Sequence, residues 1–345
     1  MRAAILAELR RPLVLDEVDL PAALNVGQVL VKVHFSGVCG SQLGEIDGAK
    51  GEDKHLPHLL GHEGSGTVIA VGPGVRHVSE GETVVLHWRK GAGIEASPPE
   101  YRWRGARVNA GWVTTFNEYA VVSENRLTPV PSTIDRRIAA LFGCAVTTGF
   151  GVIENNVQLR IGESVVVFGA GGIGLNIVQA AALVSAYPII AVDLFENKLA
   201  LAKRLGATHI INNSTSDART KILEITENDG VDAFVDNTGI PHVIELGYSL
   251  TKPHGRVTLV GVPHGDSKIS IYSLPLHFGK RLAGSHGGES VPHLDIPRYL
   301  RLVLSGRIDL DSLVSDIVPL SDINVAIDAV RSGRAAGRCL IDLEH

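Results

Sequence analysis

The stretch "SVVVFGAGGIGLNIVQAAALVSA" (residues 164–186) decides the fold. A short apolar run leads into a glycine turn and then into an alanine-rich segment, which is the order of a buried strand, a tight turn and a helix. Its glycines fit the pattern G-x-G-x-x-G in the strand-to-helix context where that pattern binds a dinucleotide. Helix N–H groups at such a turn face the pyrophosphate. The predicted cofactor contacts are Gly169, Gly171, Gly172, Ile173 and Gly174.

Segments typical of a strand followed by a helix continue downstream of this turn. Residues 187–207 again read as a strand followed by a helix, and further strands are expected at 209–213, 231–239 and 255–263. Strands that alternate with helices favour a parallel, doubly wound sheet and an α/β fold.

Asp193 ends the second of these strands, 19 positions beyond Gly174. A carboxylate there accepts hydrogen bonds from ribose hydroxyls and repels a 2′-phosphate, so the predicted cofactor is NAD rather than NADP. Lys198 is a further candidate for a ribose or phosphate contact, with a solvated helix lysine as the alternative.

Upstream of the glycine turn, the pattern of apolar and polar residues differs. Residues 26–35, "VGQVLVKVHF", alternate apolar and polar, as in a half-buried strand. Short strands separated by glycine turns follow, so the first 130 residues or so are expected to be mostly β. A length of 345 residues suggests two domains.

Composition excludes several classes of protein. The formal net charge of −5 argues against a nucleic-acid partner. No apolar run of about 18 residues occurs, so no membrane span is expected, and the start does not read as a secretory signal. Three scattered cysteines are too few for a disulfide framework, which favours a reducing, cytoplasmic setting.

A second set of candidate residues lies in glycine-flanked loops. His62 and Glu63 stand in "GHEGSG", Cys39 in "SGVCGSQ" and Cys144 in "LFGCAVTTG". Two thiolates, an imidazole and a carboxylate suit tetrahedral zinc. Their wide spacing leaves the alternative open, in which the cysteines are small buried residues and the histidine is a hydrogen-bonded core group.

The order of these motifs resembles that of the zinc-dependent medium-chain alcohol dehydrogenases. The resemblance rests on "GVCGS", "GHEGSG", "GCAVTTG", "VVVFGAGGIGL" and "AVDLFENKLALAKRLGA", and it runs from "GQVLVKV" to the closing "GRAAGRCLIDL". It implies a mostly β, GroES-like catalytic domain at residues 1–145 and 289–345. It also implies a Rossmann NAD-binding domain at residues 146–288.

The resemblance also assigns roles to single residues. Cys39, His62 and Cys144 are expected to ligate one zinc ion, with Glu63 either binding the metal or lying just behind it. Ser41 resembles the hydroxyl that takes the substrate proton, although a turn hydroxyl is the alternative. Thr148 resembles the threonine that lies against the nicotinamide. Arg338 resembles a pyrophosphate-binding residue, with a surface arginine as the alternative.

Two departures from the family stand out. Many relatives hold a second, structural zinc through four closely spaced cysteines, but residues 87–112 contain none. We therefore expect a single zinc and a lobe held by aromatic packing, with Trp88 as a wall of the substrate pocket. The aromatic residues in question are Trp88, Tyr101, Trp103 and Trp112.

The second departure concerns proton release. Gln42 and Gly44 stand where many relatives have an aspartate and a histidine. Gln42 can hydrogen-bond a zinc-bound histidine but brings no charge, and Gly44 cannot relay a proton. The route from Ser41 must then use the cofactor ribose, water or another residue, for which His55 and His58 are candidates.

These observations predict reversible, NAD-linked oxidation of a small-molecule alcohol to a carbonyl. We favour a secondary alcohol of a polyol, sugar or cyclitol. Phosphorylated substrates suit the basic residues near the lobe, although a solvated charged face is the plainer interpretation. Those residues are Arg89, Lys90, Arg102, Arg104 and Arg107.

No nucleic-acid or membrane partner is expected, and residues 261–288 are expected to border a contact in a homodimer or homotetramer. Two alternatives remain open. One is a zinc-free reductase of enones or quinones on the same fold, which would lack the thiolate pair. The other is a catalytically silent nucleotide-binding protein.

Overall fold

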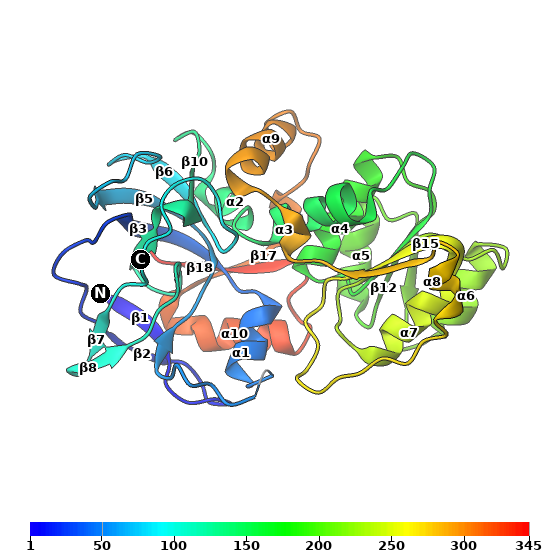
Figure 1. Ribbon diagram of the computed structural model, residues 1–345, viewed down its shortest axis with the longest axis horizontal. Coiled ribbons are helices and arrows are strands. Elements are labelled where there is room, and N and C mark those ends of the chain that lie inside the picture. Colours follow the sequence, from blue (N-terminus) through cyan, green and yellow to red (C-terminus); the bar gives the residue numbers. More distant parts are fainter. Residues whose placement is uncertain (50, 345) are drawn as a thin grey trace. The chain divides into compact units, whose positions relative to one another are not determined.

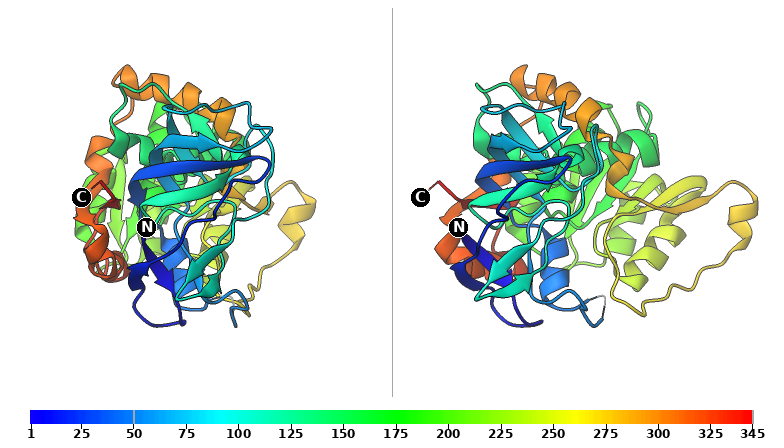
Figure 2. Two further views of the ribbon diagram at one scale, coloured as in Figure 1. Left: turned by 90° about the vertical axis from the view of Figure 1, so that its left-hand side faces the viewer. Right: turned by 60° about the vertical axis from the view of Figure 1, so that its left-hand side comes forward.

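A computed structural model describes residues 1–49 and 51–344. The chain forms two compact units (Figures 1 and 2). Unit 1 comprises Met1–Ala145, Val291–Gly306 and Val314–His345, and unit 2 comprises Val146–Ser290 and Arg307–Leu313. The short segment 307–313 thus packs with unit 2, although the sequence analysis grouped it with the C-terminal residues.

Unit 1 is built on a mostly antiparallel sheet with the order β10-β6-β5-β3-β18-β17, and β9 also pairs with β3. Only β17 and β18 run parallel. These strands are β3 (Gln28–Gly37), β5 (Glu63–Val71), β6 (Thr83–His87), β9 (Tyr119–Ser123), β10 (Leu127–Pro129), β17 (Val314–Pro319) and β18 (Arg338–Asp342).

Within the described residues, two smaller sheets and four α-helices complete unit 1. The small sheets are β2-β1-β4 and β7-β8, made of β1 (Arg2–Leu6), β2 (Val14–Glu17), β4 (His58–Leu59), β7 (Tyr101–Trp103) and β8 (Ala106–Val108). The helices are α1 (Gly40–Ile46), α2 (Arg136–Leu141), α9 (Pro292–Leu304) and α10 (Ile323–Arg331). Short helical turns lie at η1 (Glu124–Arg126) and η5 (Leu320–Asp322).

The expected β-rich core is present. Val29, Val31 and Val33 of β3 are fully buried and pack in one cluster with residues of β5, β6, β10 and β18. β3 and β5 approach closely, because a Cβ at Gly66 would lie 2.4 Å from a methyl group of Val31 and 2.6 Å from the carbonyl oxygen of Lys32. The alternation at residues 26–35 therefore marked the central strand of the unit.

Polar contacts at the end of β9 hold both the turn that precedes β6 and the lobe that follows it. Glu124 is 1% exposed and accepts backbone hydrogen bonds from Arg76 at 2.6 Å, His77 at 2.8 Å and Ile94 at 2.7 Å. The Ser123 hydroxyl accepts from the backbone N–H of Ala96 at 2.8 Å. The carboxylate and the hydroxyl thus tie the lobe to the end of β9.

The expected aromatic packing of the lobe is only partly present. Tyr101 is fully buried, and its hydroxyl accepts from the backbone N–H of Val121 at 2.7 Å. Trp103 donates to Asp16 at 2.9 Å. Trp112, in contrast, is 43% exposed, and the guanidinium of Arg126 lies over its ring at 5.3 Å.

Unit 2 contains a six-stranded, wholly parallel sheet with the order β13-β12-β11-β14-β15-β16. The strands are β11 (Val165–Phe168), β12 (Ile189–Asp193), β13 (His209–Asn212), β14 (Val231–Asp236), β15 (Thr251–Leu259) and β16 (Arg281–Gly284). The strand order reverses between β11 and β14, which confirms the predicted doubly wound fold. Ligands of such sheets bind beyond the carboxyl ends of the strands at this reversal.

One helix, α3, precedes β11, and five helices connect the strands of this sheet. They are α3 (Ala145–Gly151), α4 (Gly172–Leu183), α5 (Glu196–Arg204), α6 (Ala218–Ile225), α7 (Pro241–Leu250) and α8 (Leu274–His277), with short turns at η2 (Val152–Val157), η3 (Gly287–Glu289) and η4 (Asp311–Leu313). Val165, Val166 and Val167 are all fully buried, because helices cover both faces of a parallel sheet. Within the described residues, no helix has the length and apolar character needed to cross a bilayer.

Candidate metal centre and dinucleotide turn

Three predicted ligands meet in unit 1. Cys39 caps the N-terminus of α1, His62 precedes β5, and Cys144 directly precedes α3. Their potential ligand atoms all lie within 4.8 Å of one another, and no other group of this kind occurs in the described parts of the chain. Neither cysteine forms a disulfide, and each is 4% exposed.

Glycines make this convergence sterically possible. Gly61 has a φ of +92°, a left-handed conformation that glycine adopts without strain. A Cβ at Gly143 would lie 2.3 Å from the carbonyl oxygen of Leu86 and 2.8 Å from the Cα of Glu63. A side chain at Gly143 would therefore push the segment that carries Cys144 away from the segment that carries His62, and one at Gly61 would strain the backbone beside His62.

Glu63 is not part of this group of three and is fully buried. One carboxylate oxygen is 3.0 Å from Nε of Arg338, and the other accepts the backbone N–H of Ala145 at 3.1 Å. A Cβ at Gly37 would lie 2.3 Å from this carboxylate, so glycine is required beside it. Burial raises the pKa of Glu63 to about 7, although Arg338 acts in the opposite direction.

Arg338 adds positive charge to the same cluster. It is 4% exposed and also donates to the carbonyl oxygen of Val38 at 3.0 Å. The hydrogen bond with Cys144 lowers the pKa of the Cys39 thiol well below its ordinary value, and Arg338 adds to this effect while burial opposes it. A lowered pKa favours the thiolate that a metal requires.

Gln42 connects two of the ligands. Its side-chain oxygen accepts the backbone N–H of Cys39 at 2.8 Å, and its Nε2 lies 2.8 Å from Nδ1 of His62. Because Nδ1 is occupied in this way, Nε2 of His62 is the ring nitrogen left for a metal. Two sulfurs and one imidazole nitrogen, with no fourth protein ligand in the group, are a donor set that suits catalytic zinc.

The glycine turn of unit 2 has the geometry that a dinucleotide needs. Gly169 follows β11 with a φ of +96°, and a Cβ at Gly174 would lie 2.0 Å from its carbonyl oxygen. A Cβ at Gly171 would meet nothing within 4 Å, so open space lies beside this residue. Gly171 caps α4 without a side-chain hydrogen bond, which leaves helix N–H groups available to an anion.

Asp193 is fixed beside this turn. Its carboxylate accepts the backbone N–H of Ala170 at 2.7 Å and that of Leu194 at 2.8 Å.

Among the residues that the structure describes, the hydroxyl of Thr148 and both side-chain polar atoms of Asn237 are buried without a hydrogen-bond partner. Unsatisfied polar atoms of this kind fit a ligand that completes the site.

The comparisons with known proteins agree with this geometry. Residues 25–132 match the family described as "Alcohol dehydrogenase GroES-like domain", and residues 172–305 match "Zinc-binding dehydrogenase". An S-(hydroxymethyl)glutathione dehydrogenase of Synechocystis sp. is 32% identical over 97% of both chains. The chain belongs to the zinc-dependent medium-chain alcohol dehydrogenase family.

Solved structures show the same relationship. A zinc-binding alcohol dehydrogenase domain protein from Burkholderia ambifaria matches with a TM-score of 0.90 and 31% identity, covering 100% of this chain and 99% of that one. Benzyl alcohol dehydrogenase from Acinetobacter calcoaceticus matches with a TM-score of 0.89 and 30% identity, covering 99% and 98% of the two chains. The α/β assignment and the family prediction are thus confirmed.

The structure places the other predicted site residues as follows. Ser41 is exposed in the first turn of this dehydrogenase's α1. Lys198 lies over the ring of Phe195 at 4.8 Å. Trp88 follows β6 and carries Arg89 over its ring at 5.8 Å. The roles of Ser41, Lys198 and Trp88 remain predictions.

The burial of Arg338 contradicts one of the two roles considered for it from the sequence. Because it is buried against Glu63, the surface-arginine alternative is wrong, and its contact with pyrophosphate remains a prediction. Of the two relay candidates, His58 is tied to Asp53 at 2.8 Å. Sequence reasoning missed Gly37, Gly143 and Asn237, whose roles depend on contacts between segments far apart in the chain.

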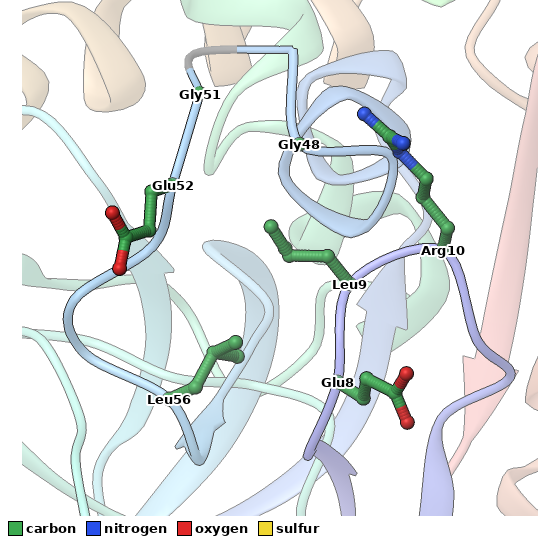
Figure 3. A pocket seen from close by; sticks show the side chains of 7 residues that line it. All are labelled: Glu8, Leu9, Arg10, Gly48, Gly51, Glu52 and Leu56. Atoms are coloured by element: carbon green, nitrogen blue, oxygen red, sulfur yellow. The ribbon is translucent and has the colours of Figure 1, made fainter.

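A separate hollow of about 500 Å³ lies elsewhere in unit 1 (Figure 3). It is lined by the turn at residues 8–10 and by Gly48, Gly51, Glu52 and Leu56, and Leu9 points into it. None of its lining residues is a metal ligand or a predicted substrate contact.

Proposed function

We propose that this dehydrogenase catalyses reversible, NAD-dependent oxidation of an alcohol at the site formed by Cys39, His62 and Cys144. The observation that carries the proposal is the set of three converging ligand atoms within 4.8 Å. Three protein ligands leave one tetrahedral position for substrate, which distinguishes a catalytic from a structural zinc site. Residues 1–145 and 289–345 are proposed as the catalytic domain, and residues 146–288 as the coenzyme domain.

When bound, zinc supplies a Lewis acid for the substrate oxygen and NAD accepts the hydride. The chain's own residues would hold the reactants and move the proton. Ser41 is proposed to accept the hydroxyl proton, and its exposure on α1 supports direct passage to water. Glu63 and Arg338 would offset one another's charge behind the ligands.

NAD is supported over NADP by Asp193. Its carboxylate is held by backbone N–H groups of the turn and of the following segment. This position leaves a fixed negative charge at the end of β12, where the ribose of a dinucleotide lies in this fold. A 2′-phosphate there would be repelled. Lys198 and Thr148 are proposed as further cofactor contacts.

The substrate is proposed to be an uncharged secondary alcohol of the polyol, sugar or cyclitol type. A phosphorylated substrate finds less support, because three of the basic side chains near the lobe have carboxylate partners. These pairs are Lys90–Glu95 at 3.2 Å, Arg104–Asp16 at 2.8 Å and Arg107–Glu100 at 3.4 Å.

Metal analysis and NADH formation test the reaction and the substrate class together. We expect one zinc per chain and NAD reduction with polyols or cyclitols. Faster turnover of benzyl alcohol or S-(hydroxymethyl)glutathione would overturn the substrate class but not the reaction. A protein without zinc that reduces enones would be a zinc-free reductase, and one that binds NAD without any turnover would be catalytically silent.

We also propose a cytoplasmic homodimer or homotetramer. Val262, Tyr272 and Phe278 of unit 2 are each at least 60% exposed, within the segment predicted to border a subunit contact. The exposure of three large apolar side chains within this one segment supports the proposal of a subunit contact there. Sedimentation velocity would show a species of two or four chains, and a monomer at micromolar concentration would refute this part.

A further inference from the structure

The Asn237 side chain carries a donor and an acceptor that the protein itself does not use. Within the described residues, neither its amide nitrogen nor its amide oxygen has a hydrogen-bond partner, and both atoms are shielded from solvent. Burial of polar groups without partners costs free energy, so each such group in a native protein needs an explanation. A bound ligand that satisfies both ends of the amide would provide one.

The backbone around Asn237 is fixed. Its N–H donates to the carbonyl oxygen of Phe168 at 2.9 Å. The preceding residue, Asp236, is fully buried and accepts the backbone N–H groups of Thr238 and Gly239, each at 2.9 Å. The Thr238 hydroxyl also donates to Asp236 at 2.6 Å. The backbone that carries the Asn237 amide is therefore held by its neighbours, while the amide takes no part in their hydrogen bonds.

The glycine turn lies directly beside this side chain. Asp236 ends β14 and pairs with Phe168, the last residue of β11, so Asn237 and Gly169 are the first residues beyond two neighbouring strands. A Cβ at Gly169 would lie 3.3 Å from Cβ of Asn237, and a Cβ at Gly174 would lie 3.3 Å from its Nδ2. The amide therefore lies against the turn that is predicted to bind the pyrophosphate.

The strand order indicates which part of a dinucleotide reaches Asn237. The order β13-β12-β11-β14-β15-β16 reverses between β11 and β14. Each half of such a sheet binds one mononucleotide, and the pyrophosphate between them lies at the glycine turn. Asp193 ends β12 in the first half, whereas Asn237 follows β14 in the second. The ribose on the side of Asn237 is therefore the one that carries the nicotinamide.

The chemistry of the amide also favours a ribose over a phosphate. An amide side chain offers donors at its nitrogen and an acceptor at its oxygen. The phosphate oxygens of a dinucleotide accept hydrogen bonds but donate none, so they would satisfy only the nitrogen. Ribose hydroxyls both donate and accept. Two adjacent hydroxyls can therefore satisfy both ends of the Asn237 amide.

We infer that Asn237 is a cofactor-binding residue that holds the ribose attached to the nicotinamide. The inference rests on the proposed NAD-linked function and deepens it, because it assigns a side chain to the half of NAD that carries the reacting ring. Asp193 is proposed to bind the adenosine ribose, so the dinucleotide is held at both of its sugars. Free energy lost to the unpaired amide in the empty protein is recovered when the cofactor binds.

Binding of two cofactor fragments tests the assignment. ADP carries the adenosine ribose and both phosphates, whereas ADP-ribose adds the second ribose. Isothermal titration calorimetry gives the dissociation constant of each fragment for the wild type, Asn237→Ala and Asn237→Leu. We expect both variants to bind ADP-ribose about 5- to 30-fold more weakly, the effect of two lost neutral hydrogen bonds. ADP binding should stay within about twofold of the wild type.

Two results of this titration would overturn the inference. One is unchanged binding of ADP-ribose in a folded variant. The other is equal weakening of ADP and ADP-ribose, which would place the contact of Asn237 on the pyrophosphate or show a general disturbance of the site.

The stability of the ligand-free protein separates a ligand contact from a structural role. Because the Asn237 amide has no partner within the described residues, its removal should not cost stability. The midpoint of thermal unfolding should stay within about 2 °C of the wild type in at least one of the two variants. A fall of more than about 4 °C in both would show that the amide stabilises the protein and would overturn the inference.

Asn117→Ala serves as the matched control. Asn117 is fully buried in unit 1, and its amide nitrogen donates to the carbonyl oxygen of Tyr119 at 2.6 Å. Loss of this hydrogen bond should lower the midpoint of thermal unfolding by more than about 4 °C. Binding of ADP and ADP-ribose should equal that of the wild type, since the residue lies outside unit 2.

Failure of the inference and failure of the proposed function give different results. If the folded wild-type protein binds neither ADP nor ADP-ribose, the proposed dinucleotide site is wrong. If the wild type binds both fragments and the Asn237 variants bind ADP-ribose equally well, the dinucleotide site stands and only the role of Asn237 is refuted.

Discussion

Replacing Glu124 should loosen both the turn before β6, which carries Arg76 and His77, and the lobe after β6, which carries Ile94. Its carboxylate accepts three backbone N–H groups, two on one oxygen and one on the other. Glu124→Ala leaves all three donors without this acceptor, at about 1–2 kcal/mol each, and should cost about 3–6 kcal/mol. Glu124→Gln keeps one oxygen and should cost about 1.5–3 kcal/mol. A domain is stable by only about 5–15 kcal/mol in all.

Urea unfolding followed by circular dichroism, at fixed zinc concentration, measures these losses. Glu82→Gln is the control, because the Glu82 carboxylate is exposed and accepts only the backbone N–H of Ser79, at 2.9 Å. Its cost should stay below about 0.5 kcal/mol. Limited proteolysis should cut the Glu124 variants between residues 88 and 112 faster than the wild type. A loss below about 0.5 kcal/mol in Glu124→Ala would refute the reasoning.

The hydrogen bonds of the Glu124 carboxylate should also make the stability of the protein sensitive to acid. Burial raises the pKa of Glu124, but the backbone N–H groups outweigh burial and hold that pKa below its ordinary value. A lowered folded-state pKa contributes stability that is fully present above the unfolded pKa, about 4.3, and is lost as the pH falls through the folded value. Glu124→Gln should therefore reduce the slope of stability against pH below about pH 4.3.

Three further outcomes follow from the site. Cys39→Ser should abolish both bound zinc and alcohol turnover, and retained zinc in metal analysis would contradict the ligand assignment. Gly174→Ala should destabilise the protein by about 1–3 kcal/mol, because its Cβ would lie 2.0 Å from the carbonyl oxygen of Gly169. Gly171→Ala has open space around its Cβ, so its stability should equal that of the wild type. It should nevertheless bind NADH more weakly in a fluorescence titration. Asp193→Asn should lower the NAD-over-NADP ratio of kcat/KM about tenfold, and an unchanged ratio would show that another group reads the ribose.

Much of the coenzyme fold could be predicted because its signals are local. The buried valines of β11, the turn at Gly169 and the helix after Gly171 are consecutive in the chain. The metal ligands were harder, because Cys39 and Cys144 are 105 positions apart, and spacing alone did not separate a site from two buried thiols. Family resemblance supplied what spacing could not.

Other contacts depend on which strands become neighbours. Arg338 reaches Glu63 because β18 pairs with β3, with Leu340 opposite Gly37. No local sequence pattern predicts that β18 pairs with β3. The backbone hydrogen bonds accepted by Glu124 were missed for a similar reason. In the sequence, a single glutamate after a strand looks like an ordinary surface charge.

The position of β18 has a consequence for biosynthesis. The three ligand residues are synthesised by position 144, whereas Arg338 is added almost 200 residues later. Until β18 is in place, the two thiols and the Glu63 carboxylate lack the guanidinium that is buried beside them in the folded protein. A prematurely terminated product would therefore carry the ligands but lack the strand that completes their surroundings.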